Sequence, residues 1–262
     1  MCRASRLRKL TYFRSCMKKL LPLILFVSVF ASSSFGQQFS AQKIQNLTQN
    51  SIRKGYQASV RMWAYDTVKR QQAGPQFSAV VVSPEGHILT AAHVNTPGQT
   101  YMVTFPDGKW CIARGLGEIE FKDSPMLPDV AMMKIMTKGT WPHAEMGWSS
   151  TLKINEPVVS ISYPETMNQA QPLVRFGSIT NLLNEYGFLQ STCRMEPGDS
   201  GGPLFDYLGR VIGLHSAING DIDYEVPVDL YRKYWTALNI PTTYTALPTV
   251  EDKISADPLN IL

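Results

Sequence analysis

The sequence predicts an all-β protein, a sandwich or a barrel, and three observations carry this prediction. Short strand-like runs recur from residue 58 onward, separated by turn signals such as Pro84-Glu85-Gly86 and Asn219-Gly220-Asp221. Strands do not alternate with long helical segments, and no repeat period is present. The 262 residues are 44% hydrophobic and 18% charged, which supports a packed core and excludes a wholly disordered chain.

The individual elements follow from local patterns. The polar segment 40–54 predicts a short N-terminal helix. Strands are predicted at 58–64, 77–82, 87–90, 101–105, 110–114, 130–135, 158–162, 173–179, 188–191, 203–205, 211–215 and 224–228. A final helix is predicted over 228–238, because Leu230, Tyr234 and Leu238 are spaced at four. The tail at 241–262 is weakly patterned and too short for another domain.

The first 36 residues have the organisation of a secretory signal peptide. They hold seven of the 25 Lys and Arg residues and none of the 21 Asp and Glu residues. An uncharged apolar run at 20–31 follows the cations, and Ser34-Phe35-Gly36 places small residues before a cut after Gly36. A membrane anchor or a core helix is the less favoured alternative, since a span needs ~20 apolar residues. Because Met17-Lys18-Lys19 is itself an ordinary start, residues 1–16 are interpreted as an over-extended gene start or a longer charged leader.

Removal of this leader changes the charge and the cysteine count. The remaining residues carry 18 Lys and Arg against 21 Asp and Glu, a formal charge of −3 where the whole chain has +4. The basic balance therefore gives no argument for a nucleic-acid partner, and no membrane association is expected after cleavage. Cys111 and Cys193 remain, and they either pair or stay as buried thiols; the sequence leaves both open.

Three short motifs carry the predicted chemistry. His93 ends Thr90-Ala91-Ala92-His93, Asp129 opens a hydrophobic strand, and Ser200 is the centre of the glycine-rich turn at 197–204. Each alone has an ordinary explanation, as a packed histidine, a turn acid or a hairpin turn. Together, in the order His, Asp, Ser and 36 and 71 residues apart, they predict a catalytic triad.

Each residue type fits a role in acyl transfer. Ser200 is a weak nucleophile that needs a base. His93, with an ordinary pKa near ~6.5, takes the proton and returns it to the leaving amine, while Asp129 holds the other imidazole N–H. The backbone N–H groups of Gly198 and Ser200 are predicted to form the oxyanion hole. No metal or organic cofactor is expected, because the four histidines lack zinc-ligand spacing.

On these motifs the chain resembles the chymotrypsin-like (trypsin-fold) serine proteases, roughly from residue 58 to 238. It is most similar to HtrA/Deg-type protease domains, whose S-P-x-G-x-I-L-T pattern matches 83–90 and whose nucleophile region is similar to 188–204, with Ser191 replacing a Thr. The resemblance implies two six-stranded antiparallel β-barrels with the site between them, and protein or peptide substrates. It assigns 57–240 to a protease domain, between an N-terminal segment at 37–56 and the tail at 241–262.

The resemblance also implies a pocket for the side chain before the cleaved bond, the S1 pocket. His215 stands where glutamyl endopeptidases use a histidine to hold an acidic P1 side chain, and Arg194 falls at the pocket floor. Ser216 matches a position that supports the triad Asp. These residues suggest a preference for Glu or Asp at P1. The alternative is that Arg194 points to solvent and His215 merely packs, and Glu196 could neutralise Arg194.

Two departures from the family limit the prediction. The chain has no Ile-Val-Gly-Gly sequence, so activation by a new N-terminus is not expected and Asp199 then lacks that partner. The tail has no room for a PDZ module, which needs roughly 50 residues or more. The leading hypothesis is a secreted or periplasmic serine endopeptidase that works through an acyl-enzyme. The alternative is a non-catalytic or latent protein-binding member of the same fold.

Overall fold

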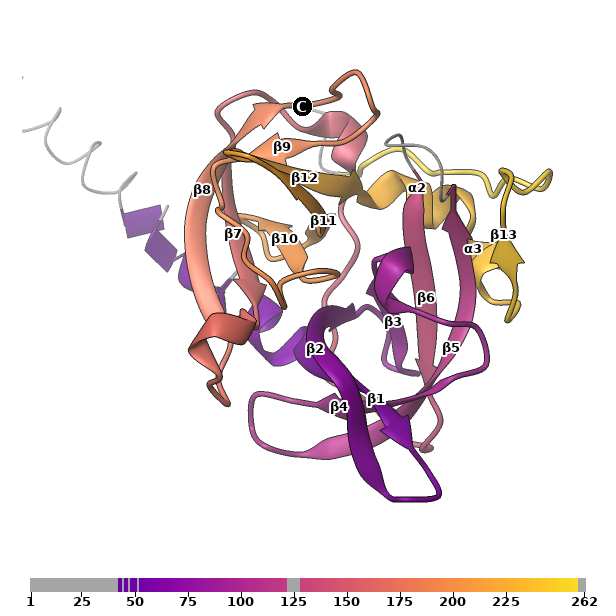
Figure 1. Ribbon diagram of the computed structural model, residues 1–262. Coiled ribbons are helices and arrows are strands. Elements are labelled where there is room, and N and C mark those ends of the chain that lie inside the picture. The colour runs from indigo at the N-terminus through magenta and orange to yellow at the C-terminus, as the bar shows by residue number, and fades with distance from the viewer. Residues whose placement is uncertain (1–41, 44, 47, 51, 122–127, 259–262) are drawn as a thin grey trace, which may run out of the picture. The chain divides into compact units, whose positions relative to one another are not determined.

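The computed structural model describes residues 42–258, apart from 44, 47, 51 and 122–127. Residues 48–262 form one compact unit, to which the following description refers. The described residues from 42 to 58 are helical, so the predicted N-terminal helix is present and runs beyond residue 54. The predicted signal peptide at 1–36 lies outside the described residues. From residue 59 the chain is mostly β, as predicted, and builds two antiparallel barrels (Figure 1).

The first barrel contains the strands up to residue 135. These are β1 (Ser59–Asp66), β2 (Gln71–Val81), β3 (His87–Thr90), β4 (Thr100–Thr104), β5 (Trp110–Glu120) and β6 (Asp129–Ile135). Their order is β5-β4-β1-β2-β3-β6, and pairing of β5 with β6 closes the barrel. A short 3-10 helix, η1 (Ala92–Val94), follows β3 and carries the predicted base.

The second barrel contains the strands from residue 157 to residue 227. These are β7 (Pro157–Ser162), β8 (Leu173–Asn181), β9 (Gln190–Ser191), β10 (Pro203–Asp206), β11 (Val211–Asn219) and β12 (Ile222–Pro227). Their order is β12-β11-β10-β7-β8-β9, and two backbone hydrogen bonds between Leu189 and Glu225 join the sheet's ends. The 3-10 helices η2 (Ser149–Thr151) and η3 (Glu165–Met167) lie in the connections. All twelve predicted strands are thus found, and the two six-stranded barrels are confirmed.

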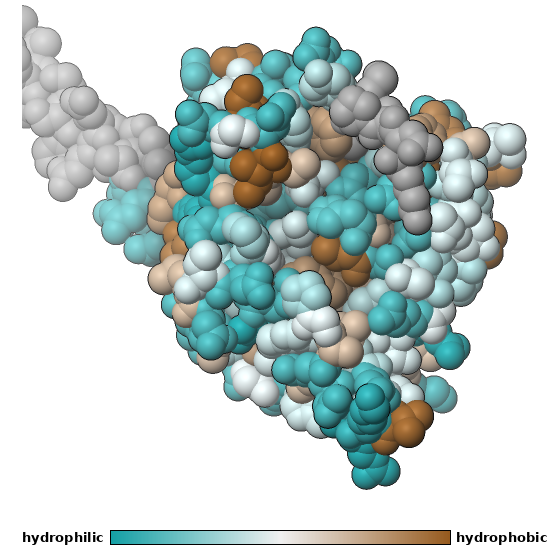
Figure 2. All heavy atoms as spheres, in the orientation of Figure 1, coloured by the Kyte–Doolittle hydropathy of each residue, from teal (hydrophilic) through white to brown (hydrophobic). Residues whose placement is uncertain are grey.

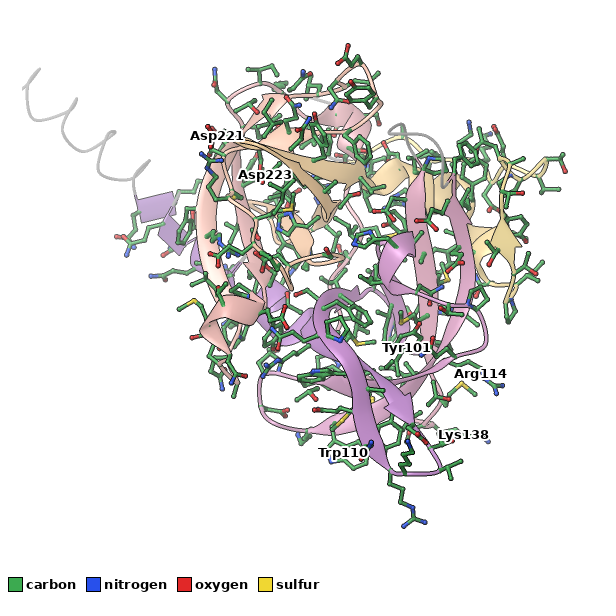
Figure 3. The ribbon with its side chains drawn as sticks, viewed as in Figure 1. Tyr101, Trp110, Arg114, Lys138, Asp221 and Asp223 are labelled. Atoms are coloured by element: carbon green, nitrogen blue, oxygen red, sulfur yellow. The ribbon has the colours of Figure 1, made fainter. Side chains whose placement is uncertain are left out.

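Alternating side chains fill the barrels. On β4, Tyr101 and Val103 are buried whereas Thr100, Met102 and Thr104 are partly exposed, as the period of two along a strand requires. Figure 3 labels Tyr101 on this strand. Cys111 and Cys193 are buried free thiols in separate core clusters, which settles the open pairing question against a disulfide. On the face in Figure 2, hydrophilic residues predominate and apolar residues form small separate patches.

The C-terminal tail is ordered, although its sequence is weakly patterned. The predicted final helix is two short helices, α2 (Val228–Lys233) and α3 (Trp235–Leu238), interrupted at Tyr234. Strand β13 (Thr243–Tyr244) then pairs in parallel with β5 of the first barrel. Further on, Asp257 accepts a 3.1 Å hydrogen bond from Arg210 of the second barrel. The tail therefore contacts both barrels. Within the described ranges, no helix is long and apolar enough to cross a membrane.

Candidate active site

His93 and Asp129 come from neighbouring elements of the first barrel and contact each other directly. The Nδ1 atom of His93 lies 2.9 Å from Oδ2 of Asp129, and the backbone N–H of His93 donates to Oδ1 at 3.0 Å. Ala91 and Ala92 are buried, so η1 packs closely onto the barrel and presents His93 outward. The His93 side chain is 37% exposed while that of Asp129 is 14% exposed. One carboxylate thus fixes both the main chain and the ring of His93.

The second barrel also binds Asp129. Ser216, on β11, donates its hydroxyl to Oδ2 of Asp129 at 2.5 Å, a contact of the kind that the resemblance implies for this position. Burial by itself raises the pKa of Asp129, but the hydrogen bonds from His93 and Ser216 and the charge of His93 outweigh it and lower the pKa. Burial likewise lowers the pKa of His93, yet Asp129 more than compensates and the net pKa is raised. Asp129 is therefore held as a carboxylate, and its presence makes His93 a stronger base than an ordinary histidine.

Ser200 lies in the loop between β9 and β10, and contacts with the first barrel hold this loop. The backbone N–H of Ser78, on β2, donates to the Ser200 carbonyl at 3.0 Å, and the Ser78 hydroxyl donates to the Gly198 carbonyl at 2.8 Å. Gly201 has a φ of +77°, and a Cβ there would overlap Thr90 of the first barrel. A glycine is therefore required for the two barrels to meet at this loop.

The predicted oxyanion donors sit in the same loop. Gly198 has a φ of +94°, and a Cβ there would approach the Glu165 nitrogen to 2.6 Å. The N–H of Glu165 donates to the Pro197 carbonyl at 2.7 Å. Because N–H and C=O point in opposite directions across a trans peptide, this bond turns the Gly198 N–H away from Glu165.

Ser200 and His93 are not hydrogen-bonded to each other. Within the described part of the chain, neither Oγ of Ser200 nor Nε2 of His93 has a hydrogen-bond partner, whereas Nδ1 of His93 is engaged by Asp129. Contacts between nucleophile and base are often loose without substrate and tighten when it binds. The outward side of the imidazole is thus left available.

The predicted S1 residues have contacts that differ from the expectation. Arg194 donates to the carbonyl and the carboxylate of Asp221, an exposed residue between β11 and β12 that Figure 3 labels beside Asp223. His215 is fully buried, and its Nε2 lies 2.6 Å from the Ser160 hydroxyl. Burial, with a smaller effect of the Arg175 charge, lowers the pKa of His215 to about 3. The structure therefore gives Arg194 an acidic partner and leaves His215 neutral.

Two residues at the site were not identified from the sequence. One is Ser78, described above, and the other is Arg175, whose Nη2 lies 2.9 Å from Oδ2 of Asp199. Asp199, for which no N-terminal ammonium is expected, thus has a guanidinium from β8 as its charged partner. Among the described residues, no group of three or more His, Cys, Asp and Glu side chains is placed to hold a metal ion.

Comparisons with known proteins assign the chain to a family. The family model of the trypsin-like peptidase domain matches residues 77–214, more than half of the chain, and this range contains His93, Asp129 and Ser200. The chain belongs to this family. Serine proteases of the family include relatives of the HtrA/DegP type, so the predicted resemblance to trypsin-fold, HtrA-type proteases is confirmed.

Individual relatives match along part of their length. The putative serine protease HhoA of Synechocystis sp. is 30% identical over 172 residues, covering 62% of this chain and 42% of that protein. The probable periplasmic serine endoprotease DegP-like of Pseudomonas savastanoi pv. phaseolicola is 32% identical over 165 residues, covering 58% of this chain and 32% of that protein. The solved structure of the HtrA-type protease AlgW with tripeptide matches with a TM-score of 0.60 and 25% identity, covering 73% of this chain and 63% of that one. The chain thus spans less than half the length of these two curated relatives.

The contact between His93 and Asp129 predicts a measurable titration. We expect the pKa of His93 to lie above that of an ordinary histidine and to fall in Asp129→Asn, which removes the negative charge. Because the base acts in its neutral form, the acid limb of any activity profile should move to lower pH in that variant. Two-dimensional NMR of the histidine side chains measures the shift, with His143 as the exposed internal control. An unchanged His93 titration would contradict the assignment.

Proposed function

We propose that this protein is a serine endopeptidase that hydrolyses peptide bonds of exported proteins or peptides. The observation that carries the proposal is the hydrogen-bonded set of His93, Asp129 and Ser216, which lies beside a glycine-rich loop bearing Ser200. The family match supports the reaction class.

The chemistry follows from the chain's own groups. Oγ of Ser200 attacks the peptide carbonyl carbon while Nε2 of His93 takes the hydroxyl proton. The C–N bond then breaks, and His93 returns the proton to the leaving amine, which leaves an ester on Ser200. A water, deprotonated by His93, hydrolyses the ester. Asp129 stabilises the imidazolium throughout, and the N–H groups of Gly198 and Ser200 are assigned to the developing oxyanion.

One observation favours a different function. Ser200 and His93 share no hydrogen bond, an arrangement compatible with a latent or non-catalytic protein-binding member of the fold. The complete set of donors around Asp129 favours the enzyme, because binding alone requires no oriented imidazole. The two functions differ in the reactivity of Ser200.

Reaction with a fluorophosphonate separates these functions. We expect a single covalent adduct on Ser200 of the native protein, located by mass spectrometry of its peptides. Ser200→Ala should abolish the adduct and lower peptide cleavage by ~10⁶-fold, and His93→Ala by a similar factor. Ser191→Ala removes a different hydroxyl of the same barrel and serves as the control, which should keep the adduct on Ser200. A native, folded protein that forms no adduct and cleaves no peptide would overturn the proposal.

The preference at P1 is a separate question. An acidic P1 requires a cation in the pocket, and the predicted cations are Arg194 and His215. The contacts of both weigh against that role: Arg194 is paired with Asp221, and the pKa of His215 is lowered to about 3. Glu225, on β12 and also fully buried, has its Oε1 3.9 Å from Nδ1 of His215, but burial raises the pKa of Glu225 to about 8, so it is not a fixed negative charge that would keep His215 protonated. We therefore propose an uncharged P1 side chain, with the acidic preference as the alternative.

A peptide series that varies only P1 tests this choice. We expect uncharged P1 residues to be cleaved at least about tenfold faster than Glu or Asp, because an unpaired carboxylate is costly to bury. Arg194→Ala should leave the profile unchanged if Arg194 serves only Asp221. A preference for Glu that disappears in His215→Ala would instead establish the acidic pocket.

We further propose that residues 1–36 are an export signal and that 57–240 form the protease domain. The leader's charge pattern supports export, and several relatives are named periplasmic. On expression in a Gram-negative host, we expect the exported protein to begin near residue 37, as read by N-terminal sequencing. Replacement of Leu23 and Leu25 by Arg interrupts the apolar run and should retain the protein, uncut, in the cytoplasm. An uncut N-terminus on exported protein would contradict the signal peptide.

A further inference from the structure

The residue immediately before the nucleophile carries a fully buried carboxylate. Asp199 is 0% exposed, and its Oδ2 accepts a 2.9 Å hydrogen bond from the Glu196 backbone N–H. Oδ2 also lies 2.9 Å from Nη2 of Arg175. A carboxylate removed from water in this way is costly unless a cation or several donors accompany it. Burial raises the pKa of Asp199 and outweighs the lowering of that pKa by the Arg175 charge, so the net pKa is raised and Arg175 offsets only part of the cost of an ionised Asp199 inside the protein.

Arg175 is itself fixed in place. It lies on β8 opposite Ser160 of β7, and its side chain is only 13% exposed. Its Nη1 donates to the Ser162 hydroxyl at 3.2 Å, and Nη2 lies 3.5 Å from the Glu196 carboxylate. The guanidinium thus joins two strands of the second barrel to the loop that carries Ser200.

Asp199 also takes part in the turn of that loop through its backbone. Its backbone N–H donates to the Glu196 carbonyl at 3.0 Å, and its carbonyl accepts from Gly202 at 2.8 Å. Asp199 stands directly between Gly198 and Ser200, whose N–H groups are the assigned oxyanion donors. The Cα atom of Asp199 joins the peptide that carries the Ser200 N–H to the preceding peptide, so the inward direction of the side chain restricts the Ser200 donor directly and the Gly198 donor through one further residue.

We propose that Arg175 is a positioning residue that holds the oxyanion loop in its reactive conformation, in place of an N-terminal ammonium created by cleavage. This inference rests on the proposed peptidase function. The pairing uses an internal side chain, so the loop needs no proteolytic event to acquire its cation. A protein built in this way has its oxyanion hole formed as soon as it folds.

Loss of the guanidinium should therefore affect the reaction more than the binding of substrate. Without Arg175, the buried Asp199 either takes a proton or turns out to water, and turning out rotates the adjoining amides. Removal of one oxyanion donor typically lowers kcat by ~10²–10³-fold. We expect Arg175→Ala to lower kcat by about this factor, with a much smaller change in KM, since substrate contacts outside the oxyanion hole remain.

Steady-state kinetics of the full chain, with the rate of fluorophosphonate labelling on Ser200, test the inference. Arg175→Lys keeps the charge but not the forked geometry and should recover part of the lost kcat. Guanidinium ion at sub-denaturing concentration should also raise kcat of Arg175→Ala, because it can refill the vacated site. Thermal melting and near-UV circular dichroism check that each variant is folded, and Asp199→Asn provides a second variant that removes the pair from its other side.

A matched control distinguishes positioning from general stability. Arg210 is another largely buried arginine of the second barrel, 2.7 Å from Asp206 and 3.1 Å from Asp257, with a side chain 15% exposed. Arg210→Ala should lower the melting temperature, leave kcat unchanged and show no rescue by guanidinium.

The outcomes separate this inference from the proposed function. A wild-type protein that neither labels nor cleaves overturns the proposed function, and this inference with it. If the wild type reacts and folded Arg175→Ala and Asp199→Asn keep the wild-type kcat, only the role of Arg175 is overturned. If kcat falls in both Arg175→Ala and Arg210→Ala, in each case in proportion to the loss of melting temperature, the positioning role is likewise overturned and Arg175 is only a structural residue.

Discussion

The carboxylate of Asp129 receives hydrogen bonds from both barrels, and the arrangement of the site depends on it. His93 of the first barrel donates from its backbone and its ring, and Ser216 of the second barrel donates its hydroxyl. A carboxylate so little exposed remains ionised only when such donors replace water. Asp199 lies at the other end of the site, where Arg175 offsets part of the cost of burial, although the net pKa of Asp199 is still raised. Two largely buried acidic side chains are thus proposed to fix the orientation of the base and of the nucleophile loop.

The strands were largely predictable because alternation of apolar and polar residues is a local property. The continuation of β5 beyond Arg114 was not predictable, because Gly115 and Gly117 are typical of the end of a strand. In the fold, the missing side chain of Gly117 lets the backbone of Leu238 and Ile240 approach, as a Cβ there would lie 2.8 Å from each. The ordered tail was missed for a similar reason: its contacts are hydrogen bonds and ion pairs to distant residues, which leave no periodic pattern.

The candidate site likewise contains residues that the sequence predicts and residues that only the fold reveals. The sequence predicts roles for His93, Asp129 and Ser200 because each lies in a short motif whose chemistry is local. Ser78 and Arg175 could not be found, because their importance arises only when strand pairing brings β2 and β8 to the nucleophile loop. The burial of His215 also depends on the closed second barrel, and it changes a candidate cation into a neutral residue bonded to Ser160. Motifs thus predict the proposed reacting groups, while the groups proposed to position them are visible only in the fold.

The two barrels together are proposed to present Ser200, its base and its oxyanion donors to one carbonyl group. The most direct measurement is a crystal structure of the protein with a peptide boronic acid, which forms a tetrahedral adduct with a reactive serine. We expect a bond from boron to Oγ of Ser200, one boronate oxygen within hydrogen-bond distance of the Gly198 and Ser200 amides, and Nε2 of His93 facing the adduct. A boronate bound elsewhere, or an adduct whose oxygen finds neither amide, would contradict this arrangement.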